Sequence, residues 1–201
     1  MFQPRSIQSS MTLRDKIVSM DYILILSILL LGIISMFAMY STDGGKFDYH
    51  TKSHILRFGV FFIMFLVLSL FQIRFWYQTS TLLYISFFIL LLGVKYFGLT
   101  SSGSQRWLNF YFMNLQPSEL MKIGLIIFLA KYYHRISTQD VNRIKFLFLP
   151  IVALVAPVLL VVAQPDLGTS ILIALGGVTV SWLAGVRVKF FAYASILFIS
   201  L

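Results

Sequence analysis

The sequence contains no cysteine among its 201 residues. Disulfide bonds and thiolate metal sites are therefore excluded, and cysteine usage leaves the redox compartment undetermined. Charge is also scarce, because Asp, Glu, Lys and Arg make up 11% of the chain, whereas soluble domains carry about 25%. With 59% hydrophobic residues and a mean hydropathy of +0.88, the composition predicts an integral membrane protein.

Acidic residues are fewer than basic ones, because the chain has 7 Asp and Glu and 16 Lys and Arg. The formal net charge is therefore +9. Such a surplus could belong to a nucleic-acid-binding protein. Here, however, the basic residues mostly flank apolar runs and form no basic patch interleaved with aromatic residues. Membrane topology explains their placement better, and no nucleic-acid partner is predicted.

The apolar runs predict an all-α fold, a polytopic transmembrane helix bundle with six complete spans and a truncated seventh. Each complete span approaches the roughly 20 residues that a membrane-crossing helix needs, and Pro157 is expected to kink the fifth. The seventh run, 190–201, would be only about 18 Å long, against a hydrocarbon core of about 30 Å. We therefore expect the sequence to be the N-terminal part of a longer protein. The six predicted spans are 22–40, 57–71, 75–94, 117–133, 146–163 and 167–186.

Residues 1–21 are polar and are predicted to form a cytoplasmic segment of a single transmembrane domain covering 1–201. The run 22–40 is too long for the core of a signal peptide and no small-x-small cleavage site follows it, so we expect it to be retained. With the N-terminus inside, the inner segments carry 10 basic residues and the outer ones 6. This bias predicts a cytoplasmic N-terminus. The inner residues are Arg5, Arg14, Lys16, Arg74, Lys131, Arg135, Arg143, Lys145, Arg187 and Lys189, and the outer ones are Lys46, Lys52, Arg57, Lys95, Arg106 and Lys122.

The stretch 103–122 combines aromatic residues with a helix start that carries charge. Pro117 is suited to the first helical position, which places Glu119 where its side chain can bond back to the Gln116 amide. Lys122 lies three residues further on and shares a helix face with Glu119. The carboxylate could be a helix cap and nothing more, but ionisable groups inside a membrane boundary are functional candidates. We favour a functional or site-organising role.

A second helix start of the same kind follows Gln164. Here Pro165 is expected at the first helical position and Asp166 at the second, near the positive end of the helix dipole. Ahead of both starts, residues 101–115 predict a loop and then an interfacial segment with Arg106, Trp107 and further aromatic residues. That segment suits an interfacial belt without a ligand, and it equally suits a site where Arg106 holds a phosphate.

Other candidates are weaker. The histidines His50, His54 and His134 lack metal-ligand spacing with any acidic cluster. Small residues at Gly177, Ser181 and Gly185 repeat every fourth position and predict close helix packing within the molecule. The segment 41–54 mixes both charges and is expected to be a solvated outer loop.

Three motifs in this order resemble the SEDS family of bacterial cell-wall proteins (shape, elongation, division and sporulation). They are Arg106-Trp107, Gln116-Pro-Ser-Glu119-x-x-Lys122 and Gln164-Pro-Asp-Leu-Gly-Thr-Ser170. The opening of the chain, residues 21–45, is more similar to the rod-shape members than to the division members. The resemblance implies a bundle of ten transmembrane helices, of which this chain supplies six and part of a seventh.

The implied activity is the polymerisation of peptidoglycan glycan strands from lipid II at the outer membrane face during cell elongation. The implied location is the bacterial inner (cytoplasmic) membrane. The implied partners are a class B penicillin-binding protein, other membrane proteins of the elongation complex, and membrane lipids. Two alternatives stay open, a transporter of the lipid-linked precursor and a non-catalytic scaffold for the penicillin-binding protein.

The resemblance also assigns residues. It places the substrate-binding residues Arg106, Glu119, Lys122 and Asp166 around a central cavity, where they would pair with one another and contact the pyrophosphate of the substrate. A divalent cation that binds the pyrophosphate is the one cofactor it suggests, and the sequence shows no ligand set for that cation. The family's catalytic acid lies in an outer loop beyond the seventh helix, where no position of this sequence matches, so the catalytic residue is unknown and the chain alone is expected to be inactive. The supporting residues are Trp107, Gln116, Pro117, Gln164 and Pro165.

Overall fold

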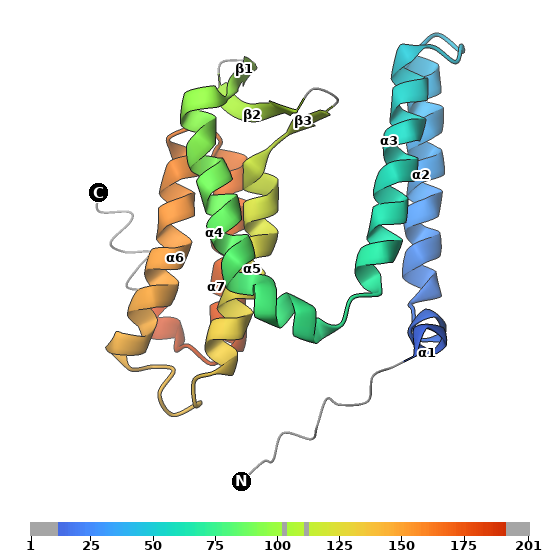
Figure 1. Cartoon of the computed structure of the whole chain (residues 1–201). Helices are drawn as coiled ribbons and strands as arrows, with labels where there is room; N and C mark the ends of the chain where they lie inside the picture. The colour runs from blue at the N-terminus through green and yellow to red at the C-terminus, as the bar shows by residue number, and fades with distance from the viewer. Residues whose placement is uncertain (1–11, 102–103, 111–112, 192–201) are drawn as a thin grey trace. The chain divides into compact units, whose positions relative to one another are not determined.

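A computed structural model describes residues 12–101, 104–110 and 113–191 (Figure 1). Their contacts divide the chain into two compact units, Met1–Gln72 and Ile73–Leu201, and each is described here by itself. The first contains α1 (Leu13–Val18), α2 (Tyr22–Thr42) and α3 (Tyr49–Ser69). The second contains α4 (Ile73–Phe97), β1 (Leu99–Ser101), β2 (Ser104–Phe110), β3 (Met113–Leu115), α5 (Pro117–His134), α6 (Ile144–Val162) and α7 (Leu167–Leu183).

Four helices in the described part of the chain are long and apolar enough to cross a membrane, namely α2, α3, α4 and α6. The apolar helix α7 is shorter, and α5 carries Glu119, Lys122 and Lys131 within its 18 residues. The predicted mostly helical, multi-pass membrane bundle is thus confirmed. Of the predicted seventh run, Phe190 and Phe191 are helical. Residues 1–11, with Arg5, and residues 192–201 lie outside the described part.

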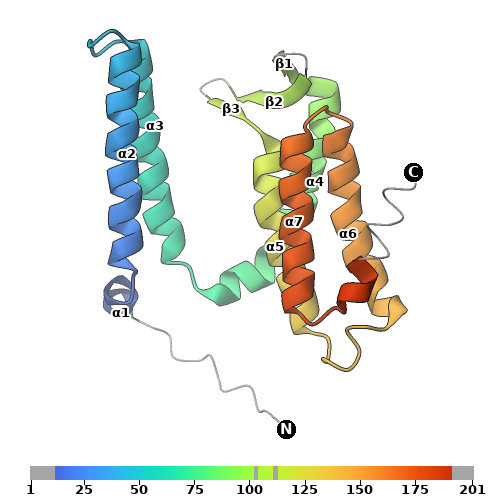
Figure 2. The same ribbon diagram turned by 180° about the vertical axis from the view of Figure 1, so that it is seen from behind.

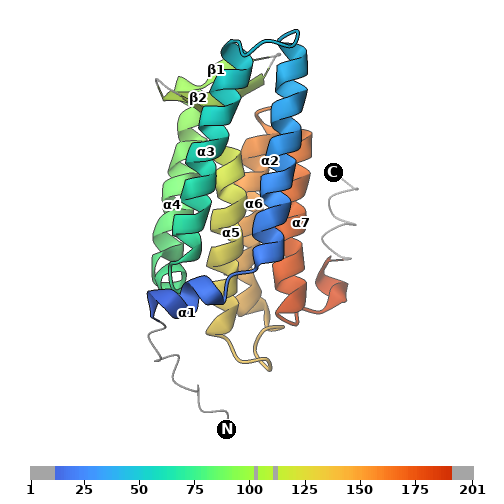
Figure 3. The ribbon, with the colours of Figure 1, turned by 90° about the vertical axis from the view of Figure 1, so that its right-hand side faces the viewer.

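The first unit is built around the antiparallel hairpin of α2 and α3, which Figure 3 shows side by side. At the connection, the Asp43 carboxylate accepts hydrogen bonds from the Thr51 hydroxyl at 2.6 Å and the Thr51 N–H at 2.8 Å. These bonds lower the pKa of Asp43, since they favour the charged carboxylate. The prediction of a loop over 41–54 and a span beginning at 57 was wrong here, because α3 begins at Tyr49 behind the N-cap Asp48.

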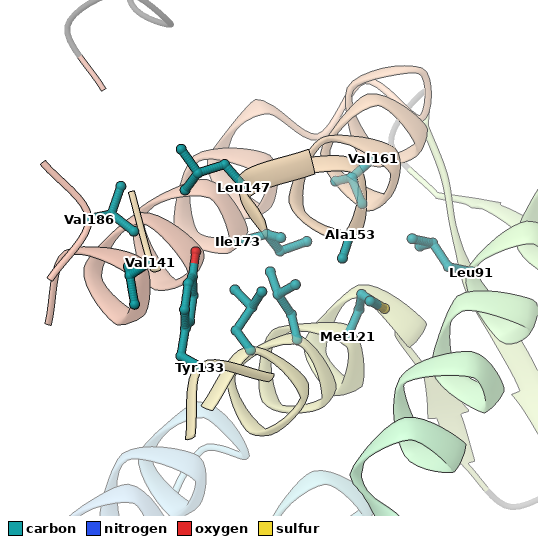
Figure 4. Close-up of a cluster of buried hydrophobic side chains, with 11 residues drawn as sticks. Leu91, Met121, Tyr133, Val141, Leu147, Ala153, Val161, Ile173 and Val186 are labelled. Carbon is teal, nitrogen blue, oxygen red and sulfur yellow. The ribbon is translucent and has the colours of Figure 1, made fainter. Parts of the chain in front are cut away.

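The second unit has a hydrophobic core between α4, α5, α6 and α7 (Figure 4). The helix α5 contributes Met121, Leu125 and Leu129, each with no exposed surface. An apolar cluster of this kind fixes the helices against one another through close packing. The other members are Leu91, Tyr133, Val141, Leu147, Ala153, Val161, Ile173 and Val186.

The helix α6 continues past two internal prolines, Pro150 and Pro157. A proline has no N–H, so the carbonyl four residues earlier loses its helical partner. Those two carbonyls belong to Phe146 and Ala153, and each accepts a 2.8 Å hydrogen bond from a tyrosine hydroxyl, Tyr132 and Tyr84 respectively. Neighbouring helices thereby satisfy the backbone groups that the prolines leave, as a membrane interior requires.

The small residues of the predicted stripe do not share one environment in the structure, because two are buried and one is exposed. Gly177 is buried, and a Cβ there would lie 2.5 Å from a Leu154 methyl carbon. Ser181 is also buried and accepts a 3.2 Å hydrogen bond from the Tyr133 hydroxyl. Gly185, in contrast, is exposed beyond the end of α7 with φ +95, where it serves as a helix-ending residue. The expectation that it belongs to the packing stripe was wrong.

Candidate functional site

A small antiparallel sheet lies at the end of the second unit where α5 and α7 begin (Figures 1 and 2). Its strand order is β1-β2-β3, with Thr100 opposite Gln105 and Asn109 opposite Asn114. A loop and an interfacial segment were predicted for this region, and the strands are a finding of the structure. Residues 102–103 and 111–112 lie outside the described part, while Arg106 and Trp107 lie in β2.

Asp166 is the centre of the polar contacts at this end. Its side chain is only 7% exposed, and both carboxylate oxygens accept hydrogen bonds. Oδ1 accepts from the Thr169 N–H at 3.2 Å, and Oδ2 accepts from the Thr169 hydroxyl at 2.9 Å and from the Gln116 side-chain amide at 3.1 Å. Arg106 Nη1 lies 3.5 Å from the same Oδ2. One carboxylate therefore links β2 and the N-terminal ends of α5 and α7.

The place of Asp166 in its helix differs from the prediction. We expected Pro165 at the first helical position and Asp166 at the second, but α7 begins at Leu167 and Asp166 is its N-cap. The physical reason is the bond from the Thr169 N–H, because an N-cap carboxylate satisfies an amide that has no helical partner. Pro165 lies exposed in the turn before it.

Arg106 lies between the buried carboxylate and solvent. Its side chain is 32% exposed while it pairs with Asp166, and its neighbour Trp107 is partly buried. Burying Asp166 as an ion is costly unless the charge is paired and hydrogen-bonded, and this set of donors meets both conditions. The guanidinium is thus held at the edge of the site, where part of the Arg106 side chain stays exposed.

Glu119 and Lys122 form a second pair, within α5 itself. Lys122 Nζ lies 2.8 Å from Glu119 Oε2 and 2.9 Å from Oε1, which confirms that they share a helix face. Glu119 is at the third helical position, but its described hydrogen bond is to Lys122 and not to the Gln116 amide. The carboxylate is 54% exposed and the lysine 24%, so this pair is more accessible than Asp166.

Three of the remaining predicted residues lie at helix ends. Pro117 is buried at the start of α5, with Gln116 as the N-cap. Gln164 donates from its side-chain amide to the Leu91 carbonyl of α4 at 3.3 Å. Thr169 was missed as a partner of Asp166. The available signal was Asp166 itself, because aspartate is a favoured N-cap residue whose carboxylate accepts from the amide two or three positions further on.

The described residues include no group of three or more His, Asp or Glu side chains that could hold a metal ion. The donors at this end are two separate carboxylates, each engaged with a cation. This donor set does not fit a divalent cation held by the protein alone, and we derive no step through one. His50, His54 and His134 are likewise outside any such group.

Comparisons with a family model and with individual proteins point to the same family. The model for the FtsW/RodA/SpoVE cell cycle proteins matches residues 16–201. The chain is 34% identical over 186 residues to the peptidoglycan glycosyltransferase MrdB of Escherichia coli (strain K12), covering 92% of this chain and 49% of that protein. It is 31% identical over 162 residues to a probable peptidoglycan glycosyltransferase FtsW of Buchnera aphidicola subsp. Schizaphis graminum, covering 78% and 46%.

Among the solved structures that share the fold, two are compared with this chain. One comes from a peptidoglycan synthase complex that coordinates polymerization and crosslinking. Its TM-score is 0.73 at 24% identity, and the match covers 90% of this chain and 54% of that one. The other is the rod shape determining protein RodA of Thermus thermophilus, with TM-score 0.72, 22% identity, and coverage of 89% and 60%. The chain spans about half the length of the curated relatives that it matches.

Proposed function

Because the chain belongs to the FtsW/RodA/SpoVE family of cell cycle proteins, we propose that its whole protein is a peptidoglycan glycosyltransferase. It polymerises lipid II into glycan strands at the outer face of the bacterial cytoplasmic membrane, during elongation of the cell. The observation that carries this proposal is the Asp166-centred contact set, which joins three elements at one end of the bundle and fixes Arg106 at its exposed edge.

The reaction joins two lipid-linked sugars. A sugar hydroxyl of one attacks the anomeric carbon of the other, the bond from that carbon to the diphosphate breaks, and the lipid diphosphate leaves with the electron pair. Negative charge on the leaving group is stabilised by donors that are already in place. We assign this task to Arg106, whose guanidinium binds phosphate oxygens through parallel N–H groups.

Asp166 acts through its neighbours as a positioning residue. It holds Arg106 at 3.5 Å and Gln116 at 3.1 Å, so the contact with the diphosphate is oriented before substrate arrives. The Glu119–Lys122 pair lies in the first turns of α5, and we assign its exposed atoms a place beside the substrate. Trp107, Gln116, Pro117, Gln164 and Pro165 support the frame.

The attacking hydroxyl needs a base to take its proton. We assign this role to neither acid at this end. Both oxygens of Asp166 already accept hydrogen bonds, and Glu119 is paired with Lys122 at 2.8 Å. These contacts leave neither carboxylate free to accept the proton of the attacking hydroxyl.

The same proposal covers orientation and partners. The basic residues that gather at the opposite end of the bundle favour that end as cytoplasmic, with the N-terminus inside. The likeness to a chain from a complex of polymerisation and crosslinking supports a class B penicillin-binding protein as the partner. Other membrane proteins of the elongation complex would assemble around this pair.

The test is reconstitution of the full-length protein with its penicillin-binding protein and fluorescent lipid II, followed by gel analysis of glycan products. We expect Arg106→Gln and Asp166→Asn each to lower polymer formation by roughly 100-fold. The control is Arg143→Gln, because Arg143 also pairs with an aspartate, at 2.9 Å, but at the other end of the bundle. It should leave the product within about twofold of wild type.

Three outcomes would overturn the proposed activity or the proposed site. If wild-type protein forms no polymer but moves lipid II between leaflets, the protein is a transporter. If it does neither and still stimulates crosslinking by its partner, it is a scaffold. If polymer forms and Arg143→Gln reduces it as strongly as Arg106→Gln, the site has been placed at the wrong end.

A further inference from the structure

The end of the bundle opposite Asp166 carries a second cluster of charge, where the first turns of α4 meet the last turn of α5 (Figure 1). Tyr77 of α4 is its centre. The Arg135 Nε donates a 2.9 Å hydrogen bond to the Tyr77 hydroxyl. The Arg135 guanidinium carbon and the Lys131 Nζ both lie 5.5 Å from the centroid of the Tyr77 ring. Two cations therefore converge on one aromatic side chain.

The contacts of these cations are with neutral groups. Lys131 Nζ lies 3.1 Å from the Thr81 hydroxyl and 3.5 Å from the Gln78 carbonyl oxygen. Within the described residues, neither Lys131 nor Arg135 forms an ion pair with a carboxylate. The acid nearest in sequence, Asp140, already binds Arg143 at 2.9 Å and the Ser137 hydroxyl at 2.8 Å. The positive charge beside Tyr77 is therefore uncompensated by this part of the chain.

The surroundings place this cluster at the depth of lipid headgroups. Tryptophan and tyrosine gather at membrane–water interfaces, and Trp76, Tyr77 and Tyr132 lie at this end of α4 and α5. Further basic residues belong to the same end through the first turns of α4 and α6 and the segment after α7. They are Arg74, Lys145, Arg187 and Lys189.

We propose that Lys131 and Arg135, beside Tyr77, bind the headgroup phosphate of an anionic phospholipid. The ammonium supplies a point charge and the guanidinium supplies directed N–H donors, while the tyrosine hydroxyl orients Arg135. Basic pockets between transmembrane helices bind anionic headgroups in this way. The site is distinct from the Arg106 region and does not depend on which reaction occurs there.

The experiment uses the protein purified in a neutral detergent and transferred to bilayer discs of phosphatidylcholine with increasing phosphatidylglycerol. Native mass spectrometry counts the phosphatidylglycerol molecules retained by each variant. The double variant Lys131→Gln/Arg135→Gln should bind phosphatidylglycerol at least about tenfold more weakly. The matched control, Arg143→Gln/Lys145→Gln, removes the same formal charge from the same end and should stay within about twofold of wild type.

The charge-preserving variant Lys131→Arg/Arg135→Lys keeps both positive charges but loses the Arg135 bond to the Tyr77 hydroxyl, so its binding should lie between that of wild type and that of Lys131→Gln/Arg135→Gln. Excess inorganic phosphate should leave the retained lipid in place, and displacement would instead identify a site for soluble anions. Equal losses in the two double variants would mean a diffuse surface potential and no specific site. An unchanged lipid count in Lys131→Gln/Arg135→Gln would overturn the proposal outright.

Discussion

The two ends of the second unit differ in how fully their basic side chains are paired with carboxylates. At the end where α5 and α7 begin, Arg106 pairs with Asp166 and Lys122 pairs with Glu119. At the other end, Arg143 pairs with Asp140, whereas Lys131 and Arg135 contact neutral groups. The 18 residues of α5 join the two ends, and at 1.5 Å per residue they separate them by about 27 Å.

This difference separates two uses of polar residues in a membrane protein. Side chains that satisfy one another across elements make a rigid site whose geometry exists before a ligand arrives. Cations whose charge is uncompensated need an anion from outside the described chain. Mutations of the buried Asp166 contacts at the first end should therefore reduce the stability of the fold, while mutations of Lys131 and Arg135 at the second should reduce binding and leave stability nearly unchanged.

The largest effect is expected from Asp166→Ala. This change leaves the Thr169 N–H, the Gln116 amide and Arg106 without their common acceptor. Unsatisfied buried donors are costly, and solvent around the one-third-exposed Arg106 reduces the cost somewhat. We expect the free energy of unfolding to fall by about 2–4 kcal/mol, measured by denaturant or thermal unfolding in detergent micelles.

The matched variant is Asp140→Ala at the other end. Its partner Arg143 is 63% exposed and Asp140 is 31% exposed, so the loss should stay below about 1 kcal/mol. Asp166→Asn should fall between the two, because an amide oxygen can still accept from the Thr169 N–H. Equal losses for the two alanine variants would remove the proposed distinction between the ends.

A smaller effect is expected from Gln116→Ala. The Gln116 amide donates a 3.1 Å bond to Asp166, and a hydrogen bond of this kind contributes about 1 kcal/mol, somewhat more when the acceptor is charged. The same unfolding measurement should therefore show a loss of about 1–2 kcal/mol. Gln139→Ala is the control, since Gln139 is exposed in the connection between α5 and α6, and it should cost less than about 0.5 kcal/mol.

The sequence predicted where most helices lie because apolar length is a local signal. The helix α7 begins at Leu167, the first residue of the predicted span but two residues after Pro165, the expected first helical position. The starts of α2 and α5 fall on the predicted residues Tyr22 and Pro117. The start of α3 does not, because its first turns are polar and are held by Asp48 and by the Asp43–Thr51 bonds. Hydropathy detects only the part of a helix that lipid would cover.

The polar site was predicted as a set of residues but not as a set of contacts. The Glu119–Lys122 pair follows from helical spacing alone. The links from Asp166 to Arg106 and Gln116 join residues 60 and 50 positions apart in the sequence, and nothing in local pattern specifies them. The three short strands were missed for a related reason, since strand pairing depends on partners outside each strand.

The Glu119–Lys122 pair should contribute little to stability. It lies within one helix, and the 54% exposure of Glu119 lets water and salt screen it. A double-mutant cycle with Glu119→Gln, Lys122→Met and the double variant should give a coupling of about 0.3–0.5 kcal/mol that weakens with added salt. A coupling above about 2 kcal/mol, insensitive to salt, would place the pair in the same class as the Asp166 contacts.

The smallest change in intrinsic stability is expected from Lys131→Gln/Arg135→Gln. In pure phosphatidylcholine the double variant should unfold within about 0.5 kcal/mol of wild type, because the lost contacts are exposed and neutral. A ligand that binds only the folded state stabilises it by an amount that grows with the logarithm of its concentration above the Kd, and so raises the unfolding temperature. Phosphatidylglycerol should therefore stabilise wild type and leave this variant almost unaffected.

Asp166→Ala supplies the decisive comparison for that result. Its baseline stability is low, yet its response to phosphatidylglycerol should equal that of wild type, because mutations at sites more than about 10 Å apart have additive effects. If Asp166→Ala also loses the lipid response, the two ends are coupled through α5. The paired end would then depend on what the other end binds, and charge at one membrane face would set the geometry of the site at the opposite face.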